Sequence, residues 1–427
     1  MKYEHDCLNL LKKRGLIFQI SNELSLQNYI FQKKIFLYCG FDPTADSLHL
    51  GHLLPIICLK IFQKYGHTPY ILIGGGTCLI GDPSFKKGIR KKIDLERIKY
   101  NQKKIKNQLS FFFPKKNDVN DIHFLNNNSW LQNMNFFYFL ENIGKYFSVN
   151  SMMNRESVKK RLEDKNFGLS FTEFTYSLLQ AYDFYHLYKT YGIILQIGGS
   201  DQWGNMISGI HLINKIYQKQ VFSLTTPLFT KFNGEKFGKT ETGTIWLDSK
   251  KTSPYSFYQF WRNLPDNTVD RAFQLFLVFG ITISIFVPIN NLKFKDIIEK
   301  KIFLAENMTL FVHGQGNLLA VQRIVQCLFH RGDLSVLTEI DFLQLLQDGI
   351  PSYSNLEFCK LPELLVKIKL APSRYQARVM ILSGAIQVNR KIQKDINFLC
   401  SDHDIFFKKF TLICRGKKHY VLIHWKK

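Results

Sequence analysis

The feature that most constrains this chain is a strand-turn-helix pattern close to its start. An apolar run at residues 35–39 is followed by Gly40 and Pro43, and then by His49-Leu50-Gly51-His52. We expect a buried strand, a tight turn and a helix with Ser47 as its N-cap. Histidines three residues apart lie on one face of a helix, and the glycine between them leaves room for a nucleotide against the backbone. The pattern therefore predicts a ligand site at the end of a strand.

A basic turn about 180 residues further along gives the histidine pair its chemical interpretation. On its own, an H-x-x-H helix more often carries two surface histidines than a ligand site. The second element, Lys236-Phe237-Gly238-Lys239-Thr240, adds ammonium groups and a hydroxyl. Together with imidazoles and backbone amides, these groups suit the oxygens of phosphates. The two elements therefore predict a site for the phosphates of ATP.

Strand-like and helical patterns alternate between about residues 33 and 229, which is typical of βαβ units and a parallel sheet. The predicted strands are residues 35–39, 69–74, 122–125 and 193–198. In such α/β sheets the ligand lies beyond the carboxyl ends of the strands. Tyr38 and the segments 74–77 and 198–202 fall at those ends, so we expect them to line the site.

Five segments are predicted along the chain. They are a Rossmann-like catalytic domain (1–230), a mobile loop with the Lys236–Thr240 element (231–250), an α-helical domain (251–337), a linker (338–357) and a small basic α+β domain (358–427).

The charge of the chain suggests a polyanionic partner. Its 57 Lys and Arg residues against 34 Asp and Glu residues give a net charge of +23. Segments 86–106 and 351–427 hold much of this excess. A solvated helix face or AT-biased codons would also produce basic runs, so charge alone does not identify RNA as the partner.

Cysteine spacing and hydropathy exclude several other classes of protein. The eight cysteines form no C-x-x-C pair, so neither a zinc site nor a disulfide framework is expected. No secretory signal core is present, and polar residues interrupt the apolar stretch 273–289. We expect that stretch to be buried, with no membrane span. The cysteine usage fits a reducing cytosol or organelle interior, and we predict a cytoplasmic location.

Five ordered motifs resemble the tyrosyl-tRNA synthetase family of bacterial and organellar type, within the class I aminoacyl-tRNA synthetases. The histidine element and the Lys236–Thr240 element resemble the two class signatures. The other three are Gly74-Gly75-Gly76-Thr77 with Gly81-Asp82-Pro83-Ser84, Thr172-Glu173-Phe174 with Tyr176, Gln180 and Asp183, and the run from Gln196 to Asn205.

The resemblance implies ATP as a substrate with Mg²⁺, and no protein-bound metal. Catalytic roles at the phosphates are implied for Thr44, His49, Lys86, Arg90, Lys236 and Lys239. ATP contacts are implied for Cys39, Gly51, His52, Asp201 and Thr240. Alone, Cys39 would more often be a small buried hydrophobe, and His52 a packed or solvated side chain.

The resemblance also implies L-tyrosine as the amino acid. Asp82, Tyr176 and Gln180 would bind its α-ammonium group, and Tyr38 and Asp183 its hydroxyl, while Thr77 and Gln202 would complete the pocket. A buried polar pair at the hydroxyl would reject phenylalanine, because its groups would otherwise be left unpaired.

The carboxyl-terminal segment resembles the S4-type RNA-binding domain, which implies tRNA(Tyr) as the other partner. Arg374 and Arg378 would display their charges on one helix face for phosphate contacts. The family pattern also implies a homodimer formed around residues 126–161. The apolar run 136–147 suits such an interface, although an ordinary buried helix would look the same.

Three positions depart from the family pattern: Cys78 and Phe85 stand where glycines are usual, and the stretch 273–289 is unusually apolar. Phe85 would stiffen the loop that carries Lys86 and Arg90. Two alternatives to a tyrosine-specific enzyme stay open, a tryptophan-specific enzyme of the same class and a non-catalytic RNA-binding protein derived from a synthetase.

Overall fold

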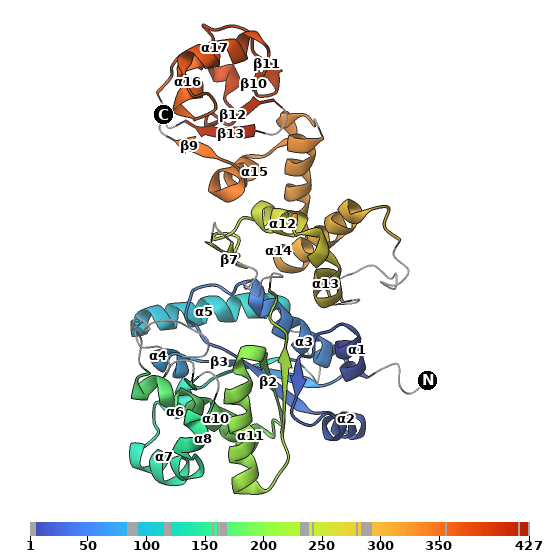
Figure 1. Ribbon diagram of the computed structural model, residues 1–427, viewed down its shortest axis with the longest axis vertical. Helices are drawn as coiled ribbons and strands as arrows, with labels where there is room; N and C mark the ends of the chain where they lie inside the picture. Colours follow the sequence, from blue (N-terminus) through green and yellow to red (C-terminus); the bar gives the residue numbers. More distant parts are fainter. Residues whose placement is uncertain are drawn as a thin grey trace. The chain divides into compact units, whose positions relative to one another are not determined.

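The chain divides into two compact units in the computed structural model (Figure 1). The structure describes residues 6–82, 93–114, 121–155, 158–159, 162, 169–230, 239–240, 243–278, 281–282, 293–330, 332–354, 357–416 and 419–425. The first unit comprises Met1–Trp246 with Asp266–Leu292, and the second comprises Leu247–Pro265 with Lys293–Lys427. Our five-segment division of the chain stays a proposal.

The first unit alternates strands and helices. Its elements are α1 (Cys7–Lys13), β1 (Gln19–Ile20), α2 (Glu23–Gln32), β2 (Phe36–Phe41), η1 (Leu50–His52), α3 (Leu53–Lys64), β3 (Thr68–Ile73), α4 (Thr77–Ile80), α5 (Leu95–Phe112), β4 (His123–Asn126), α6 (Asn128–Leu131), α7 (Phe136–Asn142), η2 (Gly144–Tyr146), α8 (Val149–Met153), α10 (Phe171–Tyr191), β5 (Leu195–Gly199), η3 (Ser200–Gln202), α11 (Trp203–Tyr217), β6 (Phe222–Thr226), β7 (Lys239–Thr240), β8 (Gly243–Thr244) and α13 (Asp266–Phe276).

These strands form a six-stranded sheet in the order β1-β6-β5-β2-β3-β4. Every pairing is parallel except that of β1 with β6. Each strand predicted from the sequence lies within two residues of an observed one, so the predicted Rossmann-like parallel sheet is confirmed. Strand β2 lies inside the sheet, and its residues Leu37, Tyr38 and Cys39 are all buried. Its sequence is therefore a continuous apolar run, as is usual in a parallel sheet covered on both faces.

The strand order reverses direction between β2 and β5. From β2 the chain moves outward to β3, whereas from β5 it moves outward in the opposite direction to β6. Because crossover connections are right-handed, α3 and α11 cover opposite faces of the sheet (Figure 1). Ligands of open α/β sheets bind at such a reversal of strand order.

Two long helices, α10 and α11, pack together in this unit. Ser170 is the N-cap of α10 and forms a reciprocal capping box with Glu173, while Gly192 ends the helix in the left-handed region at φ 68°. Phe184 of α10 is fully buried and reaches Gly209 of α11. The contact is close because the glycine presents no side chain.

The second unit contains helices and a separate sheet. Its elements are α12 (Pro254–Arg262), α14 (Ile297–Phe329), η5 (Leu334–Val336), α15 (Glu339–Gln344), the π-helix η6 (Leu345–Gly349), β9 (Ser352–Ser354), α16 (Leu361–Lys367), α17 (Arg374–Leu382), β10 (Ile386–Val388), β11 (Lys391–Ile392), η7 (Asp402–Asp404), β12 (Phe410–Arg415) and β13 (His419–His424).

The sheet of the second unit confirms the predicted small α+β domain near the carboxyl terminus. Its strand order is β11-β10-β12-β13-β9, antiparallel except for β9 against β13. Strand β9 comes from the segment predicted as a linker. A buried core of aliphatic side chains from α16, α17 and the strands includes Leu364, Ile381 and Ile413.

Most of the described apolar side chains in the stretch that begins at Phe273 are buried, whereas Gln274 is exposed. Phe273, Phe276, Leu277 and Val278 are all core residues of the first unit, and the part beyond Thr282 lies outside the described residues. Searching the described part of the chain finds no helix with the length and apolar composition needed to span a membrane.

The close contact between α10 and α11 predicts that Gly209→Ala destabilises the first unit. An added Cβ would lie 2.9 Å from Phe184 Cδ1 and 3.0 Å from its Cβ, so we expect a loss of about 1–3 kcal/mol in the free energy of unfolding. Gly204→Ala, in the same helix, is the control because its added Cβ meets no heavy atom within 4 Å. That variant should be neutral or stabilised by up to about 1 kcal/mol. Urea unfolding measures both, and equal effects would contradict the packing argument.

Candidate active site

A network of buried hydrogen bonds begins just beyond β2. Asp42 accepts a 2.8 Å hydrogen bond from the Tyr176 hydroxyl of α10 and a 2.9 Å hydrogen bond from the Thr77 hydroxyl of α4. Gly74 makes this arrangement sterically feasible, since an added Cβ would lie 1.8 Å from Asp42 Oδ1. The glycine-rich turn after β3 therefore serves first to let a carboxylate approach the backbone.

The same network continues to a second carboxylate on α10. The Asn127 side-chain amide donates to Thr77 Oγ1 at 3.0 Å and to Asp183 Oδ2 at 2.8 Å, and the Trp130 indole donates to Asp183 Oδ1 at 2.8 Å. Burial raises the pKa of Asp183 to about 7, although both donors oppose that rise. Both oxygens of this carboxylate are therefore held in fixed positions in a low-dielectric site.

Several buried polar atoms in this region have no protein partner among the described residues; Ser177 Oγ on α10 and Gln196 Oε1 on β5 are examples. Two others are the hydroxyl of Tyr38, which is buried in β2, and the buried Oε1 atom of Gln180 on α10. The pKa of Tyr38 lies well above its ordinary value because of burial and then because of the nearby Asp183 charge. Buried polar groups are normally hydrogen-bonded, so both are suited to a polar ligand.

A shorter chain of hydrogen bonds joins the segment after α4 to η3. Gln202 donates to Asp82 Oδ2 at 2.7 Å and accepts from the Asn205 amide at 3.3 Å. The Asp82 charge is one of the causes that hold the pKa of Tyr176 well above its ordinary value, after burial and Asp42. Asp82, Gln202 and Tyr176 therefore belong to one electrostatic environment.

The histidine element caps its own helix. His49, and not Ser47 as predicted, is the N-cap: its Nδ1 accepts from Gly51 N at 3.1 Å, while His52 Nδ1 accepts from His49 N at 3.1 Å. The prediction of Ser47 as the N-cap was wrong. Its hydroxyl donates to the Leu48 carbonyl and accepts from Gln108, so it does not cap the helix. The two imidazole centroids are only 4.0 Å apart.

This capping arrangement determines where the His49 proton lies. Because its Nδ1 accepts the Gly51 N–H, the neutral ring of His49 carries its proton on Nε2. The Nδ1 atom of His52 lies 3.1 Å from His49 N and 3.3 Å from the His49 carbonyl oxygen. Burial and then His49 hold the pKa of His52 well below its ordinary value. A Cβ at Gly51 would lie 3.0 Å from His49 Cε1. The glycine therefore makes room for the His49 ring, beyond the role predicted from the sequence.

The remaining predicted residues are placed as follows. Cys39 is buried in β2, where burial raises the pKa of its thiol to about 12, so it stays protonated. Thr44 is exposed after β2, and Asp201 lies in η3 beside Gly199. Lys239 and Thr240 form β7, but only their backbone is described. Lys86, Arg90 and Lys236 lie outside the described residues, as does Phe85, while Cys78 is buried in α4.

The sequence analysis missed three residues of the hydrogen-bond network around Asp183: Asp42, Asn127 and Trp130. Asp42 lies directly after β2, within the first motif, so its position at a strand end could have identified it. Asn127 and Trp130 follow β4, whose carboxyl end lies at the same edge of the sheet. Position at a strand end was their only sequence signal.

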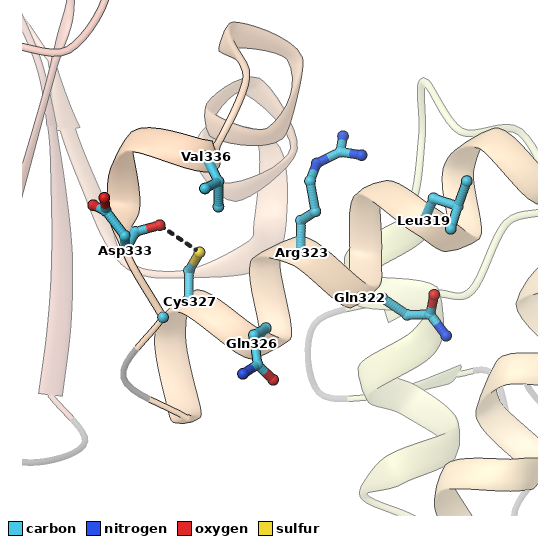
Figure 2. Close-up of a pocket in the computed structure, with 8 residues that line it drawn as sticks. Leu319, Gln322, Arg323, Gln326, Cys327, Asp333 and Val336 are labelled. Atoms are coloured by element: carbon cyan, nitrogen blue, oxygen red, sulfur yellow. Dashed lines mark hydrogen bonds between the residues drawn. The ribbon is translucent and has the colours of Figure 1, made fainter.

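The second unit contains the two arginines predicted to contact RNA and a separate hollow. Arg374 and Arg378 lie one turn apart on α17, and Arg374 forms a 3.3 Å ion pair with Glu363. The hollow has a volume of about 560 Å³ and is shown in Figure 2; Arg323, Cys327, Asp333 and Val336 are among its lining residues. It contains none of the residues predicted for the site.

Comparison with known proteins identifies the family. Residues 31–330 match the family model of class I tRNA synthetases (W and Y), and residues 341–423 match the SYY-like C-terminal domain of tyrosine–tRNA ligases. The chain belongs to the tyrosine–tRNA ligases of the class I tRNA synthetase family. The predicted family and an aminoacyl-tRNA synthetase activity are thereby confirmed, and neither alternative is favoured.

The similarity to individual members extends over almost the whole chain. Tyrosine–tRNA ligases of Blochmanniella floridana and of Escherichia coli O8 (strain IAI1) are 49% and 50% identical over 421 residues, covering 98% and 97% of this chain and 98% of each relative. A solved structure, a C-terminally truncated Aspergillus nidulans mitochondrial tyrosyl-tRNA synthetase, has a TM-score of 0.65 at 29% identity. The matched region covers 76% of this chain and 94% of the chain in the solved structure.

The raised pKa of Asp183 predicts a pH-dependent effect of Asp183→Asn on stability. The folded protein holds a proton on this carboxyl up to about pH 7, whereas the unfolded chain loses it near the ordinary value of 3.8. As the pH rises from about 3.8 to about 7, the free energy of unfolding of the wild type therefore falls relative to that of the variant. The fall is up to about 1.4 kcal/mol per pH unit. Urea unfolding of both proteins at several pH values measures the difference. A difference that does not change with pH would refute the assignment.

Proposed function

We propose that the chain ligates L-tyrosine to tRNA(Tyr) at the site around Tyr38 and Asp183. ATP first activates the amino acid to tyrosyl-adenylate and releases pyrophosphate, and the tyrosyl group then passes to the 3′-terminal adenosine of the tRNA. Family membership supports this reaction. One observation carries the choice of amino acid: the buried hydroxyl of Tyr38, which has no hydrogen-bond partner in the described part of the chain, lies near the buried carboxylate of Asp183.

These two groups are complementary to a phenol. The substrate hydroxyl can donate to Asp183, which already accepts one hydrogen bond at each oxygen, from the Asn127 amide and the Trp130 indole, and it can accept from Tyr38. An indole N–H can donate to the carboxylate but has no lone pair for Tyr38. Phenylalanine leaves the Tyr38 hydroxyl unpaired and offers Asp183 no donor, and tyrosyl-tRNA synthetases themselves are the established example of rejection by about 10⁵ in such a pocket.

The α-ammonium group fits the acceptors beside this pocket. The Tyr176 proton is already donated to Asp42, so the lone pairs of the Tyr176 oxygen are available to accept from an ammonium group. Gln180 Oε1 is a buried acceptor with no partner among the described residues. Asp82, oriented by Gln202, supplies the opposite charge. We infer that Asp82, Tyr176 and Gln180 bind the ammonium group.

In the activation step, the tyrosine carboxylate attacks the α-phosphorus of ATP, and the bond to the pyrophosphate oxygen breaks. No bond to the protein forms, so the side chains act by positioning ATP and stabilising the charge of the leaving group. His49 directs an Nε2–H donor to a phosphate oxygen, and Thr44 lies in the same segment between β2 and η1. We propose that Lys86, Arg90, Lys236, Lys239 and Thr240 also contact the phosphates, and that Cys39, Gly51, His52 and Asp201 contact the adenosine.

We propose that ATP is bound as its Mg²⁺ complex, with the ion carried by the phosphates. The described residues contain no group of three or more His, Cys, Asp or Glu side chains arranged to hold a metal ion. The donors described above are hydroxyl, imidazole and amide groups, which suit phosphate oxygens.

The tRNA and the second subunit are also proposals. Arg374 and Arg378, on a domain that matches the family's C-terminal model, are suited to tRNA phosphates. Apolar side chains exposed on α7 and α8 support a homodimer, and Phe136 and Phe137 are 62% and 78% exposed. A cytoplasmic location agrees with the bacterial relatives.

Exchange of labelled pyrophosphate into ATP, dependent on the amino acid, tests the proposed reaction. Tyrosine should support exchange, whereas tryptophan and phenylalanine should not, because neither satisfies both Tyr38 and Asp183. Tyr38→Phe should weaken discrimination against phenylalanine by about 10-fold or more, since one unsatisfied buried group is removed. Exchange with tryptophan alone, or with no amino acid, would refute the proposal.

The homodimer is tested by placing charges on the exposed aromatic surface. Phe136→Asp combined with Phe137→Asp should convert the dimer to a monomer, because carboxylates cannot be buried there without partners. Sedimentation equilibrium measures the mass. Leu24→Asp is the matched control, as Leu24 on α2 is 76% exposed but lies outside the proposed interface. A wild-type monomer, or a double variant that stays dimeric, would contradict the proposal.

A further inference from the structure

A short β-ribbon leads directly to the histidine element. Lys239 and Thr240 of β7 pair with Thr244 and Gly243 of β8. Two residues after β8, Trp246 forms an antiparallel bridge with His49, and the preceding carbonyl, that of Ile245, accepts from Leu50 N at 3.0 Å. Backbone pairing therefore joins the end of the basic motif to the turn that carries His49.

The side chain of Trp246 adds a contact of its own. Its ring lies edge-on to the His49 imidazole, with centroids 6.3 Å apart and planes at 64°. The His52 ring also lies against His49, at 4.0 Å, and Gly51 N donates to His49 Nδ1. The His49 ring is thus restrained by a hydrogen bond, by a neighbouring imidazole and by an indole.

We propose that Trp246 is a positioning residue for ATP activation. Its indole limits rotation of the His49 ring, so that Nε2–H stays directed at the phosphates, and its backbone fixes His49 to the ribbon that begins with Lys239. Trp246 itself does not contact ATP in this proposal. The inference rests on the proposed function, because it assigns His49 a donor role in the transition state.

Trp246→Leu and Trp246→Phe test the indole without changing the backbone pairing. If Trp246 positions His49, the leucine variant should lower kcat for tyrosine-dependent pyrophosphate exchange by about 10-fold, since a misplaced donor is felt most in the transition state. KM for ATP and for tyrosine should change by less than about 2-fold. Phenylalanine retains an aromatic edge and should restore most of kcat.

A double-mutant cycle with His49→Ala separates positioning from a general structural effect. His49→Ala alone should lower kcat by about 100-fold, and adding Trp246→Leu should then change it by less than about 2-fold. The inference would be overturned if Trp246→Leu lowered kcat equally in the wild-type and His49→Ala backgrounds, or if kcat of Trp246→Leu were unchanged. It would also be overturned if the loss of kcat in Trp246→Leu were matched by a fall in melting temperature and in tyrosine affinity. Wild-type protein without tyrosine-dependent exchange would refute the proposed function itself, before any variant is compared.

Discussion

The proposed amino-acid pocket depends on the burial of Asp183. A carboxylate without nearby solvent requires hydrogen-bond donors for both oxygens, and the indole of Trp130 and the amide of Asn127 supply them. That requirement links α10 to the segment after β4, and Asn127 extends it to Thr77 and then to Asp42. One continuous set of hydrogen bonds thus runs from Asp183 to Asp42 and on to the Tyr176 hydroxyl.

Glycines make this network and the histidine turn feasible by removing atoms at specific contacts. At Gly74 the contacting group is the Asp42 carboxylate, and at Gly51 it is the His49 ring. The sequence analysis attributed Gly51 to close approach of a nucleotide. The structure shows that the imidazole needs the space first, which explains why a glycine separates two histidines that cap the same turn.

Much of the site could be predicted from the sequence because parallel strands bring their carboxyl ends to one edge. Tyr38, Thr77 and Gln202 come from segments far apart in the chain, yet each follows or lies within a predicted strand end. The helical spacing of Tyr176, Gln180 and Asp183 likewise places them on one face of α10. Asn127 and Trp130 were missed since short polar segments after a strand carry no periodic signal. Ser47 was assigned as an N-cap by residue type, whereas its hydroxyl is used by Leu48 and Gln108.

By itself, the sequence determined the α/β class, the order of the strands along the chain, and the family to which five ordered motifs pointed. These follow from local hydrophobic patterns and from residue types at fixed spacing, which are properties of the chain before it folds. The tertiary structure alone decided that Tyr38 and Gln180 have polar atoms with no partner among the residues described, that Asp183 has two donors, and that Trp246 lies against His49. Such facts depend on which distant side chains meet, and burial gives them their energetic weight, because an unpaired polar group matters only where water cannot reach it.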